Sequence, residues 1–329
     1  MKKGVGVIGL GYAGGQHLDA YIENPDTEVK MVCSLPQDGI PERARDLGIK
    51  HTADWQEVIK NDDVEIVSIC TPDYQHGEQA VAAVNAGKHV FCEKPLATTV
   101  DDCQRVVDAV AKKSVKFLTG QVLRFAPLFR SLKKVFDSGK VGKPVFAESD
   151  YLHDCRALMG GWRIDPAHSP DLILGGGCHP IDLLRWIMGD VEQVYAQANK
   201  MCMPDLPMPA DNALLSLKFE NGAIGKVQVT IGCPRPYALN LSIYGDKGTL
   251  VNNKLFSEDF DELEDFIDLP LPMKAEYQYY NLEIEELVAA IKEDRETSVT
   301  ALDGAKTIAV CLAAIESAQK DAPVKVATF

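Results

Sequence analysis

The first 120 residues alternate between short apolar runs and longer amphipathic segments. The apolar runs, which we expect to form strands, lie at residues 5–9, 29–34, 65–70, 88–92 and 115–120. The amphipathic segments, expected as helices, lie at residues 12–22, 41–47, 74–86 and 99–113. Because the strand positions are nearly all apolar, the pattern predicts a parallel sheet covered by helices on both faces.

The pattern changes after Gln121. We expect helices at residues 127–138, 179–188, 281–293 and 303–320, and strands at 145–151 and between 191 and 253, with turns at Asn221-Gly222 and Asp246-Lys247-Gly248. The acidic stretch 257–268 is expected to be a solvated edge or loop. The fold class is therefore α/β, with an α/β domain at residues 1–122 and, at residues 123–329, an α+β domain with an open, mainly antiparallel sheet.

Charge and cysteine content restrict the functions that this chain can have. The formal net charge of -14 opposes binding to nucleic acid or to an anionic membrane, which requires clustered Lys and Arg. The nine cysteines are scattered and include no Cys-x-x-Cys, so we expect a reducing cytoplasm and no metal site. Glycines and Gln16-His17 interrupt the apolar start, which argues against a signal peptide, and no apolar run reaches the ~20 residues of a membrane span.

A glycine-rich turn follows the first expected strand and opens the first expected helix. Its sequence is Gly9-Leu10-Gly11-Tyr12-Ala13-Gly14. Glycines in this context allow a tight turn and a close approach to pyrophosphate, while the helix N-terminus offers N–H groups and partial positive charge. We therefore expect Gly9, Gly11, Tyr12, Ala13 and Gly14 to bind a dinucleotide, against the alternative of a merely structural turn.

The residues at the end of the second expected strand do not decide between NAD and NADP. An acid that binds the ribose hydroxyls normally stands about 20 residues after the glycine turn. Here that position is Ser34, followed by Leu35. Ser34 is compatible with a ribose hydroxyl or a 2′-phosphate, and Asp38 or Arg43 is near enough in sequence to reach in; NAD is slightly favoured.

Two further motifs end strands at the edge where ligands bind in open α/β sheets. Thr71-Pro72-Asp73 follows residue 70, and Glu93-Lys94-Pro95 follows residue 92. We expect Thr71, Pro72, His76, Glu93 and Lys94 to contact the cofactor. The alternatives are a helix cap for Thr71 and Pro72, a structural role for His76, and a surface cation for Lys94.

Several motifs occur in the order typical of one protein family. They are Gly9 to Gly14, residues 70–76 (CTPDYQH), 86–97 (AGKHVFCEKPLA), 123–125 (LRF), 139–144 (GKVGKP), Trp162-Arg163, 179–186 (HPIDLLRW) and 244–250 (YGDKGTL). In these segments the chain resembles the glucose-fructose oxidoreductase and inositol 2-dehydrogenase family, called Gfo/Idh/MocA. The resemblance covers essentially the whole chain.

This resemblance implies a Rossmann domain followed by an α+β domain, with the active site between them and subunit contacts through the open sheet. It further implies that Lys94 and His179 are catalytic and flank the carbon being oxidised. His179 would take the hydroxyl proton and Lys94 would stabilise the same oxygen as charge develops. Asp182, one helical turn after His179, would bind substrate or orient His179, with a capping or salt-bridged acid as the alternative.

The chain departs from the family pattern at two positions. Many polyol-oxidising relatives have an Asp four residues before this His, where Gly175 stands here, so Asp182, Asp171 or Asp154 would have to substitute. Many also have a polar residue at the position of Val122.

Other expected contacts lie between the sheet and the helix at residue 179. Tyr151, His153 and Arg156 are expected to bind substrate, with a solvent loop as the alternative. Arg163 matches a position near the cofactor in relatives, and Arg124 is expected to brace the domain junction. His17, His51, His89 and His168 are treated as surface or structural residues.

The function predicted from these residues is NAD(P)-dependent hydride transfer between a nicotinamide cofactor and a secondary alcohol or ketone of a sugar, inositol or related polyol. Two alternatives remain: a redox-neutral, NAD-dependent glycoside-cleaving enzyme, favoured by Gly175, and a non-catalytic dinucleotide-binding sensor. A homo-oligomer, either dimer or tetramer, is expected.

Overall fold

The computed structural model describes residues 2–35, 39–40, 42–168, 170–271 and 279–329. The chain forms two compact units. The first comprises Met1–Val122 and Gln278–Ala305, and the second comprises Leu123–Tyr277 and Lys306–Thr328. A helix near the C-terminal end of the sequence, α8 (Tyr280–Glu293), thus belongs to the first unit. The division into folding domains at residue 122 stays a prediction.

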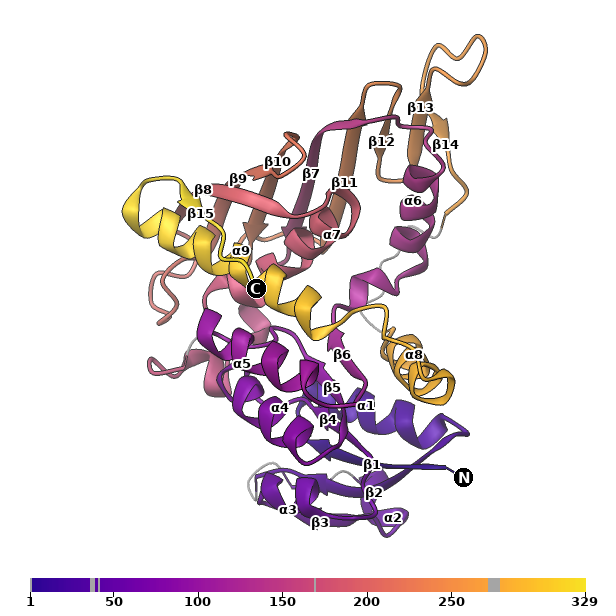
Figure 1. Ribbon diagram of the computed structural model, residues 1–329. Helices are drawn as coiled ribbons and strands as arrows, with labels where there is room; N and C mark the ends of the chain where they lie inside the picture. The colour runs from indigo at the N-terminus through magenta and orange to yellow at the C-terminus, as the bar shows by residue number, and fades with distance from the viewer. Residues whose placement is uncertain (1, 36–38, 41, 169, 272–278) are drawn as a thin grey trace. The chain divides into compact units, whose positions relative to one another are not determined.

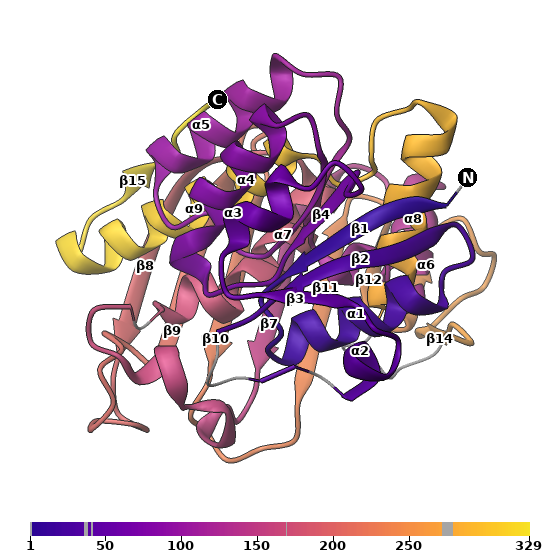
Figure 2. The same cartoon turned by 90° about the horizontal axis from the view of Figure 1, so that it is seen from below.

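The first unit is built on a parallel sheet of six strands in the order β3-β2-β1-β4-β5-β6. The strands are β1 (Lys3–Ile8), β2 (Thr27–Cys33), β3 (Lys50–Thr52), β4 (Ile66–Ile69), β5 (His89–Glu93) and β6 (Phe117–Gly120). Their helices are α1 (Tyr12–Glu23), α2 (Glu42–Asp46), α3 (Trp55–Lys60), α4 (His76–Asn85) and α5 (Val100–Ala111). Helices α1 and α8 pack together on one face of the sheet, and α4 and α5 on the other (Figure 1, Figure 2). The predicted parallel, doubly covered sheet is confirmed.

Two short elements of the first unit were not predicted. Strand β3 has three residues and pairs with β2 from Met31 opposite Lys50. Helix α3 begins after Asp54, whose carboxylate accepts a hydrogen bond from the backbone N–H of Gln56 at 2.8 Å. Both elements are too short for a periodic pattern to emerge, although the Asp54 cap was a detectable sign. The start of the predicted helix at residue 41 lies outside the described residues.

The second unit is built on a mainly antiparallel sheet of nine strands, in the order β14-β13-β12-β11-β7-β10-β9-β8-β15. Its longer strands are β7 (Pro144–Leu152), β8 (Val191–Asn199), β9 (Asn212–Phe219), β10 (Ile224–Thr230) and β11 (Ala238–Gly245). The edges are β12 (Gly248–Val251), β13 (Lys254–Ser257), β14 (Ile267–Asp268) and β15 (Val324–Lys325). Among the described strands of this sheet, β7 and β10 are the one pair that runs parallel. The predicted fold class is confirmed.

Helices cover one face of this second sheet. Helix α7 (Cys178–Met188) packs against β7 (Figure 1), and a π-helical turn, η6 (Ile173–Gly177), leads into it. The remaining elements are the 3-10 turns η2 (Asp73–Gln75), η3 (Val122–Arg124), η4 (Arg156–Leu158) and η5 (Gly161–Ile164), with helices α6 (Pro127–Asp137) and α9 (Ala301–Lys320). Except for Ser257, which is buried at the end of β13, the acidic stretch is exposed or half-buried and forms a loop and the edge strand β14, as predicted.

No helix in the described ranges combines the length and the apolar character that crossing a membrane requires.

Candidate functional site

The glycine turn after β1 packs tightly against the end of β4. Gly9 has a φ of 88°, and a Cβ on this residue would lie 2.7 Å from the carbonyl carbon and oxygen of Cys70. A Cβ on Gly14 would lie 1.8 Å from the carbonyl oxygen of Gly9. Only glycine satisfies both positions, so the close packing of strand, turn and helix depends on them.

The same turn leaves the N-terminus of α1 open. Gly11 is the N-cap residue and provides no side chain to accept the first N–H groups, and the first turn carries no acid. A Cβ built on Gly11 meets nothing within 4 Å. Backbone N–H groups and the positive end of the helix dipole therefore face an open space, which fits the pyrophosphate of NAD(P). Tyr12 and Ala13 begin this helix beside that space.

Ser34, at the end of β2, is largely occupied by the protein itself. Its hydroxyl donates to the carbonyl oxygen of Gly39 at 2.7 Å and lies 2.9 Å from His51 Nε2. Arg43 forms ion pairs with Asp19 at 2.9 Å and Glu23 at 3.4 Å. Asp38 lies outside the described residues. Arg43 is thus engaged on α1 rather than beside Ser34.

A buried histidine ties together the turns that follow β4 and β5. His76 Nδ1 lies 2.7 Å from the carbonyl oxygen of Pro95, and Nε2 lies 2.8 Å from that of Thr71. Both partners accept hydrogen bonds, and a neutral ring donates to only one of them. The Thr71 hydroxyl donates to Gln79, and Pro72 begins the turn η2. The structure therefore gives His76 a bracing role; its contact with cofactor stays a prediction.

Lys94 follows β5 at the carboxyl edge of the parallel sheet, and Glu93 fixes its backbone. The Lys94 N–H donates to Glu93 Oε2 at 3.1 Å, and Glu93 Oε1 lies 3.1 Å from His17 Nε2. His17 Nδ1 lies 2.8 Å from the Ser68 hydroxyl. His17, on α1, is fully buried, so one imidazole joins the helix of the glycine turn to β4 and to the Glu-Lys-Pro turn. The peptide between Lys94 and Pro95 is cis.

The charges around His17 are strongly shifted by burial and by each other. Burial by itself lowers the pKa of His17. The interactions with Cys70 and Glu93 outweigh this effect and raise the pKa from 6.5 to about 10. Burial raises the pKa of Glu93, but His17, Lys94 and His76 bring it below its ordinary value. Glu283, on α8, is fully buried, and burial together with the charge of Glu93 raises its pKa well above the usual range. These shifts favour an imidazolium–carboxylate pair of His17 and Glu93 beside a protonated Glu283.

Gln121 follows β6 at the same edge of the sheet and was not selected from the sequence. Its side chain is buried, and its carboxamide N and O have no hydrogen-bond partner among the residues that the structure describes. A buried amide in this situation is costly unless a ligand or water satisfies it. A single glutamine after a strand carries no sequence signal that would have singled it out.

In the second unit, His179 stands in the first turn of α7 and stacks on Tyr151 of β7. Their ring centroids are 5.7 Å apart and the rings are tilted by 19°. Both side chains are buried. Gly176 makes this approach possible, because a Cβ there would lie 2.8 Å from Cε1 of Tyr151. The π-helical turn before α7 therefore positions both rings.

His153 and Tyr237 extend this aromatic cluster. The Tyr151 hydroxyl lies 3.1 Å from His153 Nδ1, and the rings of His153 and Tyr237 meet edge to face at 5.3 Å. Partial burial lowers the pKa of His153, and Asp154 only partly offsets this. Tyr237, just before β11, was missed because no local pattern distinguishes it. Tyr151, His153 and His179 are thus brought together, as expected of a shared site.

Asp182 forms a buried ion pair instead of standing open beside His179. Its carboxylate accepts hydrogen bonds from Arg124 Nε at 2.8 Å and Nη2 at 2.7 Å, and from the Thr307 hydroxyl at 3.0 Å. The other proposed substitutes for a carboxylate at Gly175 also have partners: Asp154 pairs with Arg156, and Asp171 accepts the N–H of Ile173. Asp182 is therefore a salt-bridged acid, which was the alternative to a role in binding substrate or orienting His179. A contact between Asp182 and substrate stays a prediction.

The two remaining predicted arginines are exposed. Arg156 makes a two-point contact with the Asp154 carboxylate at 2.8 Å and 2.6 Å. Arg163 lies over the ring of Trp162, 4.5 Å from its centroid. Neither belongs to the cluster of Tyr151, His153 and His179, and their roles remain predictions.

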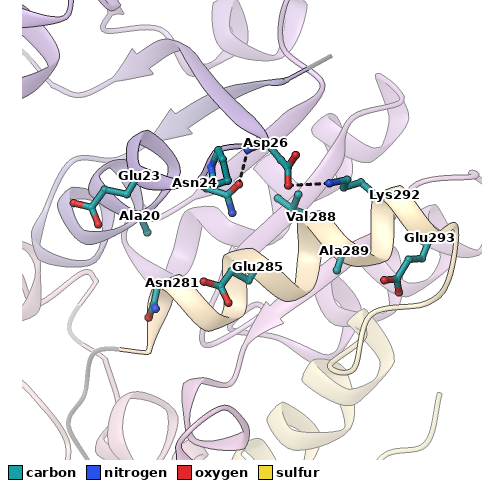
Figure 3. A pocket seen from close by; sticks show the side chains of 11 residues that line it. Ala20, Glu23, Asn24, Asp26, Asn281, Glu285, Val288, Ala289, Lys292 and Glu293 are labelled. Carbon is teal, nitrogen blue, oxygen red and sulfur yellow. Dashed lines mark hydrogen bonds and ion pairs between the residues drawn. The ribbon is translucent and has the colours of Figure 1, made fainter.

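A cavity of about 530 Å³ opens between the end of α1 and α8 and contains none of these residues. Its lining includes Glu23, Asp26, Glu285 and Glu293, with Lys292 paired to Asp26 at 2.8 Å (Figure 3). This acidic lining is unsuited to an anionic dinucleotide. Within the described ranges, no three His, Cys, Asp or Glu side chains are grouped so as to hold a metal ion.

Comparisons with known proteins agree with this architecture. Residues 3–121 match the profile of an oxidoreductase family with an NAD-binding Rossmann fold, and residues 129–251 match that of the GFO/IDH/MocA C-terminal domain. Inositol 2-dehydrogenase 2 of Saccharopolyspora erythraea is 30% identical over 99% of this chain and 97% of its own. Myo-inositol 2-dehydrogenase of Thermotoga maritima is 29% identical over 98% of each chain.

Solved structures give the same result over the full length. Levoglucosan dehydrogenase in complex with NADH superimposes with a TM-score of 0.90 at 26% identity, covering 100% of both chains. An oxidoreductase domain protein from Kribbella flavida gives the same values. With both family domains matched and a cofactor turn that fits NAD(P), the chain is an NAD(P)-dependent oxidoreductase and belongs to the Gfo/Idh/MocA family.

Proposed function

We propose that this enzyme oxidises a secondary alcohol of a sugar, inositol or related polyol, or reduces the corresponding ketone. Relatives that span nearly the whole chain are named inositol 2-dehydrogenases, and a structural relative is named levoglucosan dehydrogenase. When bound, NAD supplies the acceptor for the hydride that leaves the carbinol carbon. The chain's own residues then have to hold the alcohol and remove the proton from its oxygen.

In this proposal Lys94 stabilises the substrate oxygen. One observation carries this proposal: the backbone N–H of Lys94 donates a hydrogen bond to Glu93 at 3.1 Å. This bond fixes the backbone of Lys94 at the carboxyl edge of the sheet. An ammonium group held there donates a hydrogen bond to the hydroxyl and lowers the energy of the alkoxide as the C–H bond breaks. Gln121, at the end of the neighbouring strand β6, supplies a buried amide for the cofactor.

His179 is the proposed base for the hydroxyl proton. Stacking on Tyr151 fixes the plane of its ring, so that its ring nitrogens point in a set direction. The Tyr151 hydroxyl and His153 form a hydrogen-bonding pair beside it that suits the neighbouring hydroxyls of a polyol. In the reverse reaction the imidazolium returns the proton to the carbonyl oxygen.

NAD is the proposed cofactor in preference to NADP. A 2′-phosphate needs a cation near the end of β2, and Arg43 is engaged with Asp19 and Glu23. We expect kcat/KM with NAD+ to exceed that with NADP+ by at least about tenfold, the value of one charge-assisted hydrogen bond. Equal values for the two cofactors would contradict this assignment.

The function is tested with the purified enzyme, NAD+ or NADP+ and a panel of inositols, anhydrosugars and aldoses, followed by absorbance of the reduced cofactor. For a substrate found in this way, Lys94→Ala and His179→Ala should each lower kcat by at least about 10²-fold while dinucleotide affinity, measured by fluorescence, changes little. The matched control is Lys88→Ala, a lysine that precedes the same strand and bonds the carbonyls of Asn61 and Val64. Full turnover by both site variants would refute the mechanism.

The enzyme is further proposed to work as a cytoplasmic homo-oligomer. The open face of the second sheet carries apolar side chains, with Ile224 and Leu214 about half exposed and Phe146 beside Tyr244. Such a face favours contact with a second copy. The nine cysteines are free thiols, as expected of a protein in a reducing compartment. Cell fractionation tests the proposed cytoplasmic location.

A further inference from the structure

Two cysteines that are far apart in sequence lie side by side in the second unit. Cys202 follows β8 and Cys233 follows β10, and their sulfur atoms are 3.5 Å apart. Both residues are half-buried, so a small reagent has access to them. Six of the other seven cysteines are buried, and Cys70 is half-buried.

The backbone around Cys202 is held in place by one buried carboxylate. Asp211 is fully buried and accepts hydrogen bonds from the N–H groups of Met201, Cys202 and Met203, at 3.1, 2.8 and 2.6 Å. Three hydrogen bonds to one ionised group fix the direction in which the Cys202 side chain leaves the backbone. The position of this thiol is therefore set before any reaction.

The segment that carries Cys233 packs closely against Cys202 at Gly232. A Cβ on Gly232 would lie 2.5 Å from the Cβ of Cys202. Asn212 joins the two thiols, donating from its amide N to Cys202 Sγ at 3.6 Å and accepting from Cys233 at 3.6 Å. Glycine at position 232 and Asn212 together keep the sulfur atoms in contact.

We propose that Cys202 and Cys233 form a reversible redox pair, which closes to an intramolecular disulfide when the protein meets a small disulfide such as oxidised glutathione. The sulfur atoms need to approach by about 1.5 Å to reach bonding distance.

The reaction balances as two thiol–disulfide exchanges. A thiolate from one cysteine attacks the small disulfide, forming a mixed disulfide and releasing one small thiol. The second cysteine then attacks the protein sulfur of that mixed disulfide, closing the bond and releasing a second small thiol. The two protein thiols lose two electrons and two protons, and the small disulfide gains both.

The surrounding charges set the pH at which exchange becomes fast. The Asn212 amide lowers the pKa of Cys202, but the Cys233 thiol, partial burial and the Asp211 carboxylate raise it above the ordinary value. Because the thiolate is the nucleophile, the rate of closure rises with pH, and a pH near about 8.5 suits the experiment.

The test uses the reduced full-length protein, equilibrated with mixtures of reduced and oxidised glutathione and then denatured and alkylated. The expected result is a fall from nine to seven alkylated thiols, an intact mass lower by two hydrogen atoms, and a cross-linked peptide pair containing Cys202 and Cys233. The melting temperature should also rise and return after reduction, because the bond constrains the unfolded chain.

Variants separate this pair from other thiols. Cys202→Ser and Cys233→Ser should each abolish the loss of two thiols, whereas Cys70→Ser, which removes another half-buried thiol, should retain it. Circular dichroism checks that each variant folds. If a variant does not fold, the cross-linked peptide in the unmutated protein shows whether Cys202 and Cys233 form the disulfide. Nine thiols remaining in excess oxidant, or a mixed disulfide that persists without closing, would overturn the proposal.

Discussion

The Asp182 carboxylate shows how the environment of a residue decides what it does. It lies one helical turn after His179, a spacing that fits either a partner for the base or a structural acid. In the structure it is 1% exposed and faces Arg124, itself 7% exposed. A buried guanidinium that has lost its solvent requires such a carboxylate. The partner comes from 58 residues earlier in the chain, so the sequence around Asp182 does not reveal it.

Asp182→Asn should therefore destabilise the fold strongly. The substitution leaves the buried Arg124 charge without its counter-ion, and we expect the free energy of unfolding to fall by about 3 kcal/mol or more. Asp154→Asn is the matched control, because it removes a carboxylate from a solvent-screened pair with Arg156 and should change the free energy of unfolding far less. Urea denaturation followed by circular dichroism measures both. Equal losses would mean that burial of the Arg124 pair has no energetic weight.

At the scale of elements, the π-helical turn η6 does most to place His179 and Tyr151. The π-helical turn before α7 contains three consecutive glycines, Gly175 to Gly177. Tyr151 occupies the space beside Gly176, whereas the nearest atom to a Cβ on Gly175 lies 4.0 Å away. Neighbouring glycines thus have different reasons to lack a side chain.

Gly176→Ala and Gly175→Ala form a matched pair that tests this difference. The added methyl at 176 must displace the Tyr151 ring, and we expect a loss of roughly 1–3 kcal/mol in unfolding free energy and a changed near-ultraviolet dichroism. At 175 the same methyl meets no close atom and restricts the unfolded chain, so stability should hold or rise by about 0.5–1 kcal/mol. Denaturation curves that coincide for the two variants would contradict the stacking geometry.

The link between α1 and β5 predicts a pH dependence of stability. The pKa of His17 rises from 6.5 in the unfolded chain to about 10 in the fold. The folded protein therefore binds the proton more tightly, and this contribution is complete below pH 6.5 and is lost as pH rises towards about 10. The pKa of Glu93 is lowered by folding, so its charged form stabilises the fold at pH values above the ordinary pKa of a glutamate. This stabilisation is lost as the pH falls through the lowered pKa.

The measurement is the melting temperature of the protein and of His17→Gln between pH 6 and 9. We expect the difference between the two curves to shrink as pH rises through this window, because only the unmutated protein has the imidazolium to lose. Nuclear magnetic resonance of labelled histidines gives a second reading that does not depend on the variant. A His17 ring that deprotonates near 6.5 in the folded protein would show that the Glu93 pair does not hold its proton.

At the scale of the whole molecule, the two units bury their apolar surface in different ways. The parallel sheet of the first unit has helices on both faces, whereas the second sheet has helices on one face and alternates buried and exposed residues. Leu215 and Leu217 of β9 are buried, and the positions that alternate with them, 214, 216 and 218, are exposed. An open sheet with apolar residues among the exposed ones is suited to association.

Ile224→Lys should accordingly weaken self-association of the proposed oligomer. The substitution places a charge on the open face at the start of β10, two residues before Lys226. Leu47→Lys is the control, because Leu47 is equally exposed and lies in the first unit. Light scattering after size exclusion should give a smaller species, or a dissociation constant raised at least about tenfold, for Ile224→Lys alone. A monomeric unmutated protein would remove the basis of the oligomer proposal.

The sequence by itself determined most of the strands and helices of residues 1–122, the glycine turn and the placement of Lys94 after β5, but not β3, α3 or the addition of α8 to the first unit. These features follow from local periodicity and from backbone conformations that only certain residues adopt. The structure decided the rest, including the clamp of Glu93 by His17, the stack of His179 on Tyr151 and the contact of Cys202 with Cys233. Each of those pairs joins residues at least 28 positions apart, and only the packing of strands and helices around a buried core brings them into contact.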